Sequence, residues 1–341
     1  MGKELRNNIK ELTKIVEEYA DSLKEQTKAV LDNTIITKTI NVVTDEIVKK
    51  GKEISIEDIK KDIDKYIKDT YGIIPQRIEI KKDRKKVELE GIFHSEFENI
   101  LKIVDKNIPL MLTGPAGSGK NFTLEQTAKA LGLEFYFTNA ITQEYKLTGF
   151  IDANGSYHET EFFKAFTKGG LFFLDEVDAS CPESLLILNS AIANKYFDFP
   201  IGRYTAHEDF RVVCAGNTYG TGADMVYVGR NVLDGATLDR FVVLQFDYDE
   251  KVERSLAYDD ELYNFIVKLR EAIQNASLRY IVSMRATINA SKLLEIEVDK
   301  DTIVRDVIVK SMSKDDLNII IKKMESRHQY QSWYDALKRL C

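Results

Sequence analysis

The stretch LMLTGPAGSGK, residues 110–120, decides the fold class. Four residues typical of a buried strand run directly into a loop with three glycines, which ends in Lys120 before a segment of helical periodicity. Glycines let such a loop curl so that its backbone N–H groups face phosphate oxygens, and the helix presents its positive end. Lys120 is placed to reach the β and γ phosphates. A plain glycine-rich turn would not require a lysine at this spacing, so the stretch predicts a P-loop.

The predicted nucleotide-binding residues extend two positions into the helix. They are Gly114, Pro115, Ala116, Gly117, Ser118, Gly119, Lys120, Asn121 and Phe122. Asn121 departs from the pattern GxxxxGK[ST], in which a hydroxyl group ligates Mg²⁺. An amide oxygen is also a hard ligand, although it is neutral, larger and differently placed. We therefore predict that Asn121 belongs to the Mg²⁺ site, and slow turnover remains an open alternative.

A second chemical signal lies 55 residues after Lys120, in the stretch LFFLDEVD at 171–178. Four apolar residues form a strand that delivers Asp175 to the carboxyl edge of a sheet, where α/β proteins bind their ligands. There Asp175 can hold a magnesium ion, and Glu176 can orient and deprotonate an attacking water. A strand that ends in a polar turn is the simpler interpretation, but its spacing from the P-loop favours the catalytic one.

Beyond Gly91 the chain alternates short apolar runs with helical segments, which predicts an α/β domain. The runs cover 110–113, 134–138, 171–174, 211–215 and 242–246. Such a pattern is typical of a parallel sheet between two layers of helices. Residues 1 to about 70 and 251–341 show helical periodicity, while 77–80 and 86–90 alternate like strands around a basic turn. The predicted organisation is a mostly helical N-terminal region (1–90), an α/β core (91–250) and a helical C-terminal region (251–341).

Composition and charge limit the class of protein. The 341 residues are 44% hydrophobic and 30% charged, which describes a soluble globular protein. There is no apolar run near the ~20 residues of a membrane-spanning helix, and the first 30 residues are densely charged, so a cytoplasmic location is expected. Residues 1–90 carry 20 Lys and Arg against 19 Asp and Glu, which leaves 28 against 36 for the acidic remainder. This balance disfavours, without excluding, a nucleic-acid partner.

At this point the sequence resembles the AAA+ ATPases, in particular the MoxR branch of the dynein-related AAA type, which includes the CbbQ and NorQ activators and the CobS subunit of cobaltochelatase. The strand at 211–215 ends in Gly-Asn-Thr, where Asn217 matches the sensor-1 position. The stretch LDGATLDRF at 233–241 is similar to the family segment that carries an arginine finger. By that match Arg240 is the finger, with Arg230 as second candidate, and Ser-Met-Arg at 283–285 identifies Arg285 as sensor 2. Each of these arginines could instead form a surface ion pair.

The resemblance implies a P-loop AAA+ core with a parallel five-stranded sheet, followed by a helical lid. It further implies ATP and Mg²⁺ as cofactors, self-association into a ring that is usually a hexamer, and catalysis by Glu176, Asn217, Arg240 and Arg285. Two stretches, 145–160 and 197–210, look like the hairpins that this branch inserts near its central pore, although either could be a hairpin without a substrate role. Family members act on a separate protein, often one with a von Willebrand factor A-type domain.

Three functions remain open on the sequence. The first is a ring ATPase that remodels or activates a partner protein. The second is an assembly scaffold in which Asn121 makes hydrolysis so weak that ATP binding only builds the ring. The third is a nucleic-acid-associated motor, which the acidic core disfavours. The sequence does not predict whether ATP or GTP is bound, because the residues that contact the base in this fold do not form a recognisable motif.

Overall fold

The computed structural model describes residues 76–82, 85–324 and 328–341. The helices predicted for residues 1–70 lie outside the described residues. The two predicted strands around the basic turn are confirmed: β1 (Gln76–Lys82) pairs with β2 (Lys85–Gly91) in antiparallel register. By its internal contacts the chain forms two units, one containing β1, β2 and helix α10 (Glu250–Leu256), the other residues 94–249 and 260–341.

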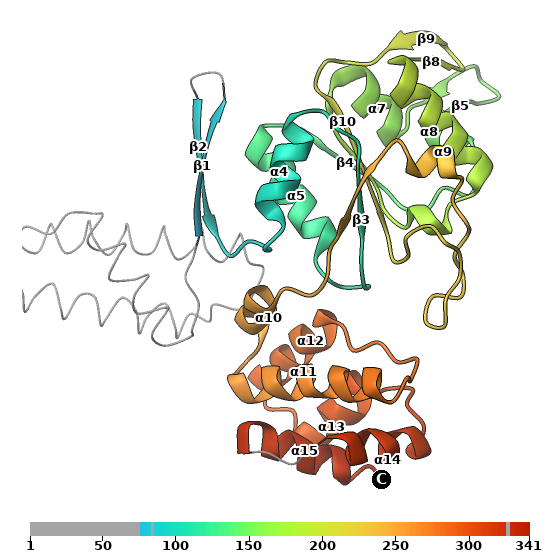
Figure 1. Cartoon of the computed structure of the whole chain (residues 1–341). Coiled ribbons are helices and arrows are strands. Elements are labelled where there is room, and N and C mark those ends of the chain that lie inside the picture. Colours follow the sequence, from blue (N-terminus) through green and yellow to red (C-terminus); the bar gives the residue numbers. More distant parts are fainter. Residues whose placement is uncertain (1–75, 83–84, 325–327) are drawn as a thin grey trace, which may run out of the picture. The chain divides into compact units, whose positions relative to one another are not determined.

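A parallel five-stranded sheet forms the centre of the larger unit (Figure 1). Its strands are β3 (Leu110–Thr113), β4 (Phe135–Thr138), β7 (Gly170–Leu174), β10 (Phe210–Gly216) and β11 (Val242–Gln245), in the order β11-β3-β10-β7-β4. All five predicted strands are therefore confirmed, and the architecture is consistent with an AAA+ α/β fold. The inner strands β3, β7 and β10 are fully buried because their apolar side chains face helices on both sides.

Helices cover both faces of the sheet. In Figure 1, α4 (Phe97–Asp105) and α5 (Lys120–Leu131) lie on one face, and α7 (Glu161–Lys168) and α8 (Pro182–Asn194) lie on the other. Aromatic side chains fill the second interface, where Phe162 makes an edge-on contact with Phe172 of β7 at a centroid distance of 5.2 Å. This packing fixes the strand ends that carry the polar residues described below.

Both predicted hairpins are confirmed as hairpins. The first follows the short helix α6 (Tyr145–Thr148) and consists of β5 (Phe150–Ile151) and β6 (Tyr157–His158). The side chain of Asp152 accepts hydrogen bonds from Asn154 N and Ser156 N, which closes the turn. The second consists of β8 (Tyr196–Phe199) and β9 (Gly202–Thr205).

The C-terminal part is helical, as predicted. It comprises α11 (Asp260–Asn275), α12 (Met284–Glu295), α13 (Lys300–Ile303), a π-helical turn (Val304–Ile308), α14 (Lys314–Lys323), a 3-10 turn (His328–Tyr330) and α15 (Gln331–Lys338). Its core is built around Trp333, which stacks on Phe265. Over the described ranges, no helix combines the length and apolar character needed to cross a bilayer.

Candidate active site

The strand register brings the predicted site residues to one edge of the sheet. Thr113 of β3 is level with Gly216 of β10, and Leu174 of β7 is level with Cys214 of the same strand. Because all strands are parallel, the loops after β3, β7 and β10 leave at the same edge. The P-loop, the Asp175–Glu176 pair and Asn217 therefore meet, as the sequence spacing predicted.

The P-loop adopts the curled path that its glycines allow. Gly117 and Gly119 have φ of 74° and 95°, a region that favours glycine, and α5 begins directly after Gly119. The ammonium group of Lys120 donates to the carbonyl oxygens of Gly114 and Pro115, both at 2.9 Å. The first turn of α5 and the Lys120 side chain thus converge on the loop, as phosphate binding requires.

Gly114 packs against backbone, and this contact carries a prediction. A Cβ atom on Gly114 would lie 2.1 Å from the carbonyl oxygen of Phe246, an atom that no side-chain rotation can move away. Gly114→Ala is therefore expected to reduce the free energy of unfolding by about 2 kcal/mol or more, the usual scale of severe overpacking. Urea denaturation measures the change. Gly235→Ala, whose Cβ would meet open space, is the control; equal stability of the two variants would contradict the contact.

Burial lowers the pKa of the Lys120 side chain. The side chain is buried, and burial is the largest cause that lowers its pKa to about 8; the negative charge of Asp175 opposes the shift, and the guanidinium of Arg285 adds to it. At neutral pH Lys120 is a cation, but it loses its proton in a range where other lysines keep theirs.

This pKa predicts how ATP affinity depends on pH. Phosphate charge favours protonated Lys120 and raises its pKa, so binding takes up a proton near and above pH 8. Affinity is expected to be flat below pH 8 and to fall by up to about tenfold per pH unit above it. Titration calorimetry in buffers of different ionisation enthalpy measures the uptake. Lys120→Arg, which stays charged, should bind without a break near pH 8; a break that persists in this variant would assign it to another group.

Asp175 and Asn121, the two residues predicted to hold Mg²⁺, lie close together at the end of β7 and the start of α5. The backbone N–H of Asp175 donates to Thr138 O at 2.9 Å, which fixes the start of the turn after β7. Burial is the largest influence on the carboxyl group and raises its pKa, while Lys120 and a hydrogen bond from the Asn121 side chain act in the opposite direction. Asn121 is therefore near Asp175, at the position where the motif has a hydroxyl. A carboxylate with a neutral amide beside it suits a hard divalent cation.

Glu176 occupies an unusual backbone conformation. Its φ of 52° lies in the left-handed region, which non-glycine residues seldom adopt, and the following 3-10 turn (Val177–Ala179) begins there. The carboxylate is half exposed and lies 3.3 Å from Nη2 of Arg230. The sequence offered Arg230 either as second candidate for the finger or as a member of a surface ion pair, and it did not identify Glu176 as the partner.

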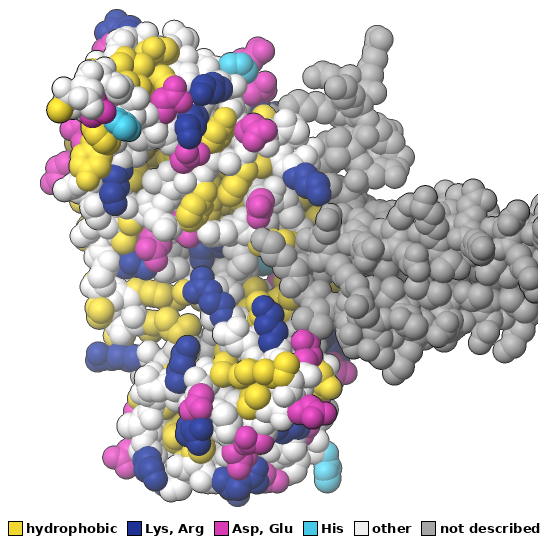
Figure 2. Space-filling view, turned by 180° about the vertical axis from the view of Figure 1, so that it is seen from behind, with side chains coloured by type: hydrophobic (Ala, Val, Ile, Leu, Met, Phe, Trp, Pro, Cys, Tyr) yellow, Lys and Arg dark blue, Asp and Glu magenta, His cyan; other side chains and the backbone are white. Residues whose placement is uncertain are grey.

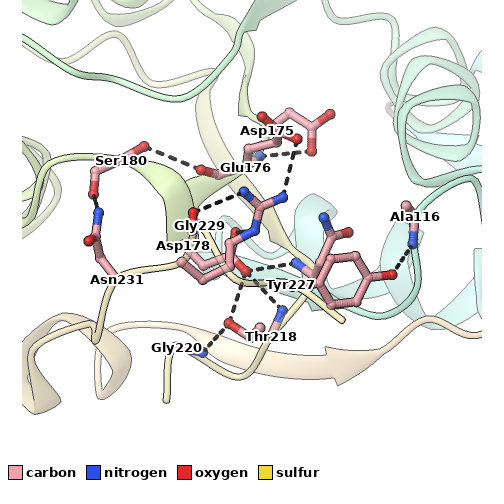
Figure 3. A network of polar contacts seen from close by, with 12 residues as sticks. Ala116, Asp175, Glu176, Asp178, Ser180, Thr218, Gly220, Tyr227, Gly229 and Asn231 are labelled. Carbon is pink, nitrogen blue, oxygen red and sulfur yellow. Dashed lines mark hydrogen bonds and ion pairs between the residues drawn. The ribbon is translucent and has the colours of Figure 1, made fainter. Parts of the chain in front are cut away.

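Asp178 organises the loop that carries Asn217, and Figure 3 shows it at the centre of the network. Its Oδ2 accepts hydrogen bonds from Asn217 N at 3.0 Å and from both the N–H and the hydroxyl of Thr218 at 2.9 Å. With its amide oriented to match its neighbours, Asn217 accepts from Nη2 of Arg230 at 2.8 Å and donates to Gly114 O at 3.3 Å. The Asn217 side chain thus joins the P-loop to Arg230.

Two tyrosines hold the Ala116 peptide of the P-loop. Ala116 N donates to the hydroxyl of Tyr227 at 2.9 Å, and the hydroxyl of Tyr248 donates to Ala116 O at 3.0 Å. The ring of Tyr248 also lies 4.2 Å from the guanidinium carbon of Arg270 on α11. These contacts connect the loop before Arg230 and the C-terminal helices to the phosphate loop.

The segment predicted as sensor 2 lies against the P-loop. A Cβ atom on Gly117 would lie 2.9 Å from the Cβ of Ser283 and 3.5 Å from the Cγ of Arg285. Ser283 caps α12 by accepting a hydrogen bond from Arg285 N at 3.3 Å. Arg285 is therefore close enough to influence Lys120, which agrees with the position expected of a residue that contacts the phosphates.

Arg240 lies apart from this cluster. It follows α9 (Gly235–Leu238), is exposed, and its guanidinium donates to the carbonyl oxygen of Ala236. Among the described residues it makes no ion pair within the site. Its role as a finger for a neighbouring subunit stays a prediction.

Sequence reasoning missed Asp178, Tyr227 and the intramolecular role of Arg230. Asp178 belongs to the stretch that was singled out, and a third carboxylate after Asp175 and Glu176 was a usable signal. Tyr227 lies 111 residues from its partner Ala116 and carries no local pattern.

The family model described as "AAA domain (dynein-related subfamily)" matches residues 109–241, which include the P-loop, Asp175 and Asn217. The match supports an AAA+ nucleotide-binding domain in this part of the chain. An uncharacterized protein of Staphylococcus epidermidis is 26% identical over 257 residues, which are 67% of this chain and 94% of that protein. One of Staphylococcus aureus is 26% identical over 270 residues, 71% of this chain and 94% of that protein.

Among solved structures, NtrX from Brucella abortus is similar with a TM-score of 0.44 and 17% sequence identity. The alignment covers 68% of this chain and 57% of NtrX, so this chain spans little more than half of that protein's length.

Proposed function

We propose that this protein is an AAA+ ATPase of the MoxR and CobS-like type, which hydrolyses ATP between the subunits of a ring, usually a hexamer, to remodel or activate a separate protein. The observation that carries the proposal is the convergence of Lys120, Asp175, Glu176 and Asn217 at one edge of a parallel sheet. The match of residues 109–241 to a dynein-related AAA domain supports the same class.

The donor set suits magnesium rather than an all-protein metal cage. Among the described residues, no group of three or more His, Cys, Asp and Glu side chains could hold a metal ion. Mg²⁺ is commonly held by one or two carboxylates together with substrate phosphates. Asp175, with Asn121 beside it, would hold the ion. When bound, the ion supplies positive charge that offsets the charge building on the β and γ phosphate oxygens.

The chain's own residues then divide the remaining work. Lys120 and the backbone of the P-loop bind the phosphates and hold the γ-phosphoryl group in place. Glu176 orients a water molecule and accepts its proton as the water attacks. Asn217 holds that water near the γ phosphate. Arg240 of a neighbouring subunit stabilises the negative charge that builds on the transferring phosphoryl group. Arg285, on α12 beside Gly117, contacts the γ phosphate and so couples the presence of this phosphate to the position of the C-terminal helices.

The two hairpins are candidate contacts for the partner protein. Phe150 and Ile151 of the first hairpin are 46% and 47% exposed, and Ile201 in the turn of the second is 41% exposed. Apolar side chains held in water at a hairpin are suited to bind an unfolded or extended segment. A protein with a von Willebrand factor A-type domain is the partner that the family resemblance suggests.

The proposal is tested by the ATPase rate per subunit as a function of protein concentration. If a neighbour completes each site, the specific rate should rise steeply with concentration, level off once rings form, and vanish when Mg²⁺ is chelated. Static light scattering on the same samples follows assembly. A specific rate that does not vary over a hundredfold dilution across which rings dissociate would contradict catalysis between subunits.

The scaffold alternative is favoured by Asn121 alone. The Asn121 side chain stands at the hydroxyl position of the motif and is close enough to Asp175 to lower the pKa of its carboxyl group, which supports a working substitute. Asn121→Thr is therefore expected to change kcat by less than about threefold, because one oxygen ligand replaces another. Steady-state phosphate release measures the ratio. A gain of about tenfold or more would favour the scaffold, in which the parent protein binds ATP but hydrolyses it poorly.

The nucleic-acid motor finds little support in the charge distribution. Figure 2 shows acidic and basic side chains interspersed over the visible face of the described residues, where a phosphate-gripping surface would gather basic ones. Because residues 91–341 also carry fewer Lys and Arg (28) than Asp and Glu (36), DNA or RNA is not expected to raise the ATPase rate, which the assay described above measures.

A further inference from the structure

We propose that Arg230 is a positioning residue that acts within its own subunit: it orients Glu176 and Asn217, the base and the sensor of the same site. Nη2 of Arg230 lies 3.3 Å from Oε1 of Glu176 and 2.8 Å from the side-chain oxygen of Asn217. A single guanidinium thus bridges Glu176 and Asn217, the two groups that are proposed to act on the attacking water molecule. This inference rests on the proposed function for its kinetic consequences.

Asp178 anchors the guanidinium. Its carboxylate is fully buried, and Oδ2 is occupied by Asn217 N and the Thr218 N–H and hydroxyl. Oδ1 has no hydrogen-bond donor among the described residues and lies 3.3 Å from Nε of Arg230, which is equally without a hydrogen-bond acceptor there. The opposite charges of Asp178 and Arg230 therefore compensate the burial of these two atoms. Separating a buried ion pair is strongly unfavourable, so Nε is held while Nη2 is presented to Glu176.

The chain around Arg230 is fastened to the same segment. Asn231 N donates to Asp178 O at 2.6 Å, and its side chain donates to Ser180 O at 2.9 Å. The loop from Thr221 to Val232 is closed by a β-bridge between these two residues. Figure 3 shows Asn231 bonded to Ser180 at the left of the network, with Asp178 at its centre. Both the backbone and the side chain of this region are thus tied within one subunit.

This arrangement distinguishes Arg230 from a finger. To reach a neighbouring site, the side chain, which is only 14% exposed, would have to leave Asp178 without a counter-charge in the protein interior. Arg240 has no such partner among the described residues, since it is exposed and donates to a backbone carbonyl of the preceding helix α9. The geometry therefore gives the two arginines different sites of action: Arg230 its own subunit, and Arg240, under the proposed function, the neighbour's.

The first test compares two substitutions. Arg230→Ala is expected to lower kcat about 10²-fold, with the Kd for a slowly hydrolysed ATP analogue changed less than about threefold, because misplaced groups slow the reaction without loosening the phosphates. Arg230→Lys keeps a cation beside Asp178 but cannot bridge three partners. It should regain the parent's melting temperature while its kcat stays at least tenfold low. If Arg230→Lys regained both the melting temperature and the kcat of the parent, Arg230 would only balance the charge of Asp178, and the proposal would be overturned.

The second test separates action within a subunit from action between subunits. Arg230→Ala protein is mixed with Glu176→Gln protein, whose own sites lack the base but whose arginines are intact. Since Arg230 serves its own site, mixing should leave the rate unchanged. The matched mixture of Arg240→Ala with Glu176→Gln should recover at least tenfold, because the neighbour supplies the finger. Recovery in the Arg230 mixture would overturn the proposal, whereas recovery in neither mixture would count against the ring mechanism.

The third measurement needs no ATPase activity and therefore separates failure of this inference from failure of the proposed function. Arg230→Gln, Asp178→Asn and the double variant are unfolded in urea at a concentration where the protein is monomeric. The equilibrium constant of the double variant should differ about tenfold from the product of the single effects, as for contacting residues. Independent effects, within about twofold, would show that Arg230 does not contact Asp178 in its own chain and would overturn the assignment.

Discussion

Arg240→Ala is expected to lower kcat by about 10³-fold or more while each subunit still binds ATP. A guanidinium that enters the neighbouring site stabilises charge on the transferring phosphoryl group, and such a group contributes about 10³- to 10⁵-fold in P-loop enzymes. Because Arg240 is exposed and makes no ion pair among the described residues, its removal should leave the fold intact. Phosphate release at saturating ATP measures kcat, and the parent's melting temperature should be retained.

The control is Arg305→Ala, another exposed arginine, which pairs with its neighbour Asp306 in the C-terminal helical part. It should alter kcat by less than about twofold. If Arg240→Ala hydrolyses ATP at the parent's rate under conditions where rings form, Arg240 is not the finger. The resemblance that assigned it would then have misled, and another exposed residue of the same segment would have to be sought.

Glu176→Gln is expected to lower kcat about 10²- to 10⁴-fold with ATP binding preserved. Glutamine has the size of glutamate and keeps an oxygen toward Arg230, but its amide cannot accept the proton that the attacking water gives up. Asp175 remains in place, so affinity for ATP with Mg²⁺ should change little. Single-turnover hydrolysis with a parallel binding titration separates the two quantities.

Glu183→Gln serves as the matched control. This carboxylate lies seven positions later, at the beginning of α8, where it accepts a hydrogen bond from the Cys181 thiol at 2.8 Å. The substitution Glu183→Gln removes the same charge from the same part of the chain, and it should leave kcat within about twofold of the parent's value. If Glu176→Gln retained more than half of the parent's rate, the general-base role would have to pass to another group.

The sheet and the P-loop could be predicted from the sequence because their signals are local. The inner strands are continuous apolar runs that end in polar turns, and Gly117 and Gly119 of the P-loop stand at positions where φ is positive. The same holds for the Asp152 turn, whose side chain bonds to backbone two and four residues on. In each case the residues that form the structure are neighbours in the chain, so their order contains the information.

The partners of Glu176 and Asn217 could not be predicted in this way. Arg230 reaches Glu176 across 54 residues of sequence, and nothing in the stretch around Arg230 distinguishes a buried ion pair from a group that reaches outward. The decision depends on the buried Oδ1 of Asp178, which becomes apparent only when the loop after β10 folds back on the turn after β7. Long-range electrostatics of this kind require the tertiary structure.

The central claim is that ATP is held by Lys120 at the P-loop, and an equilibrium binding titration tests it most directly. Titration calorimetry at pH 7 with ATP and Mg²⁺, on the parent and on Lys120→Met, gives the stoichiometry and the affinity. We expect one ATP per subunit for the parent and a loss of affinity of about 10²-fold or more in the variant, since charged hydrogen bonds to the phosphates are removed. Equal affinity in the two proteins, or no binding to the parent, would contradict it.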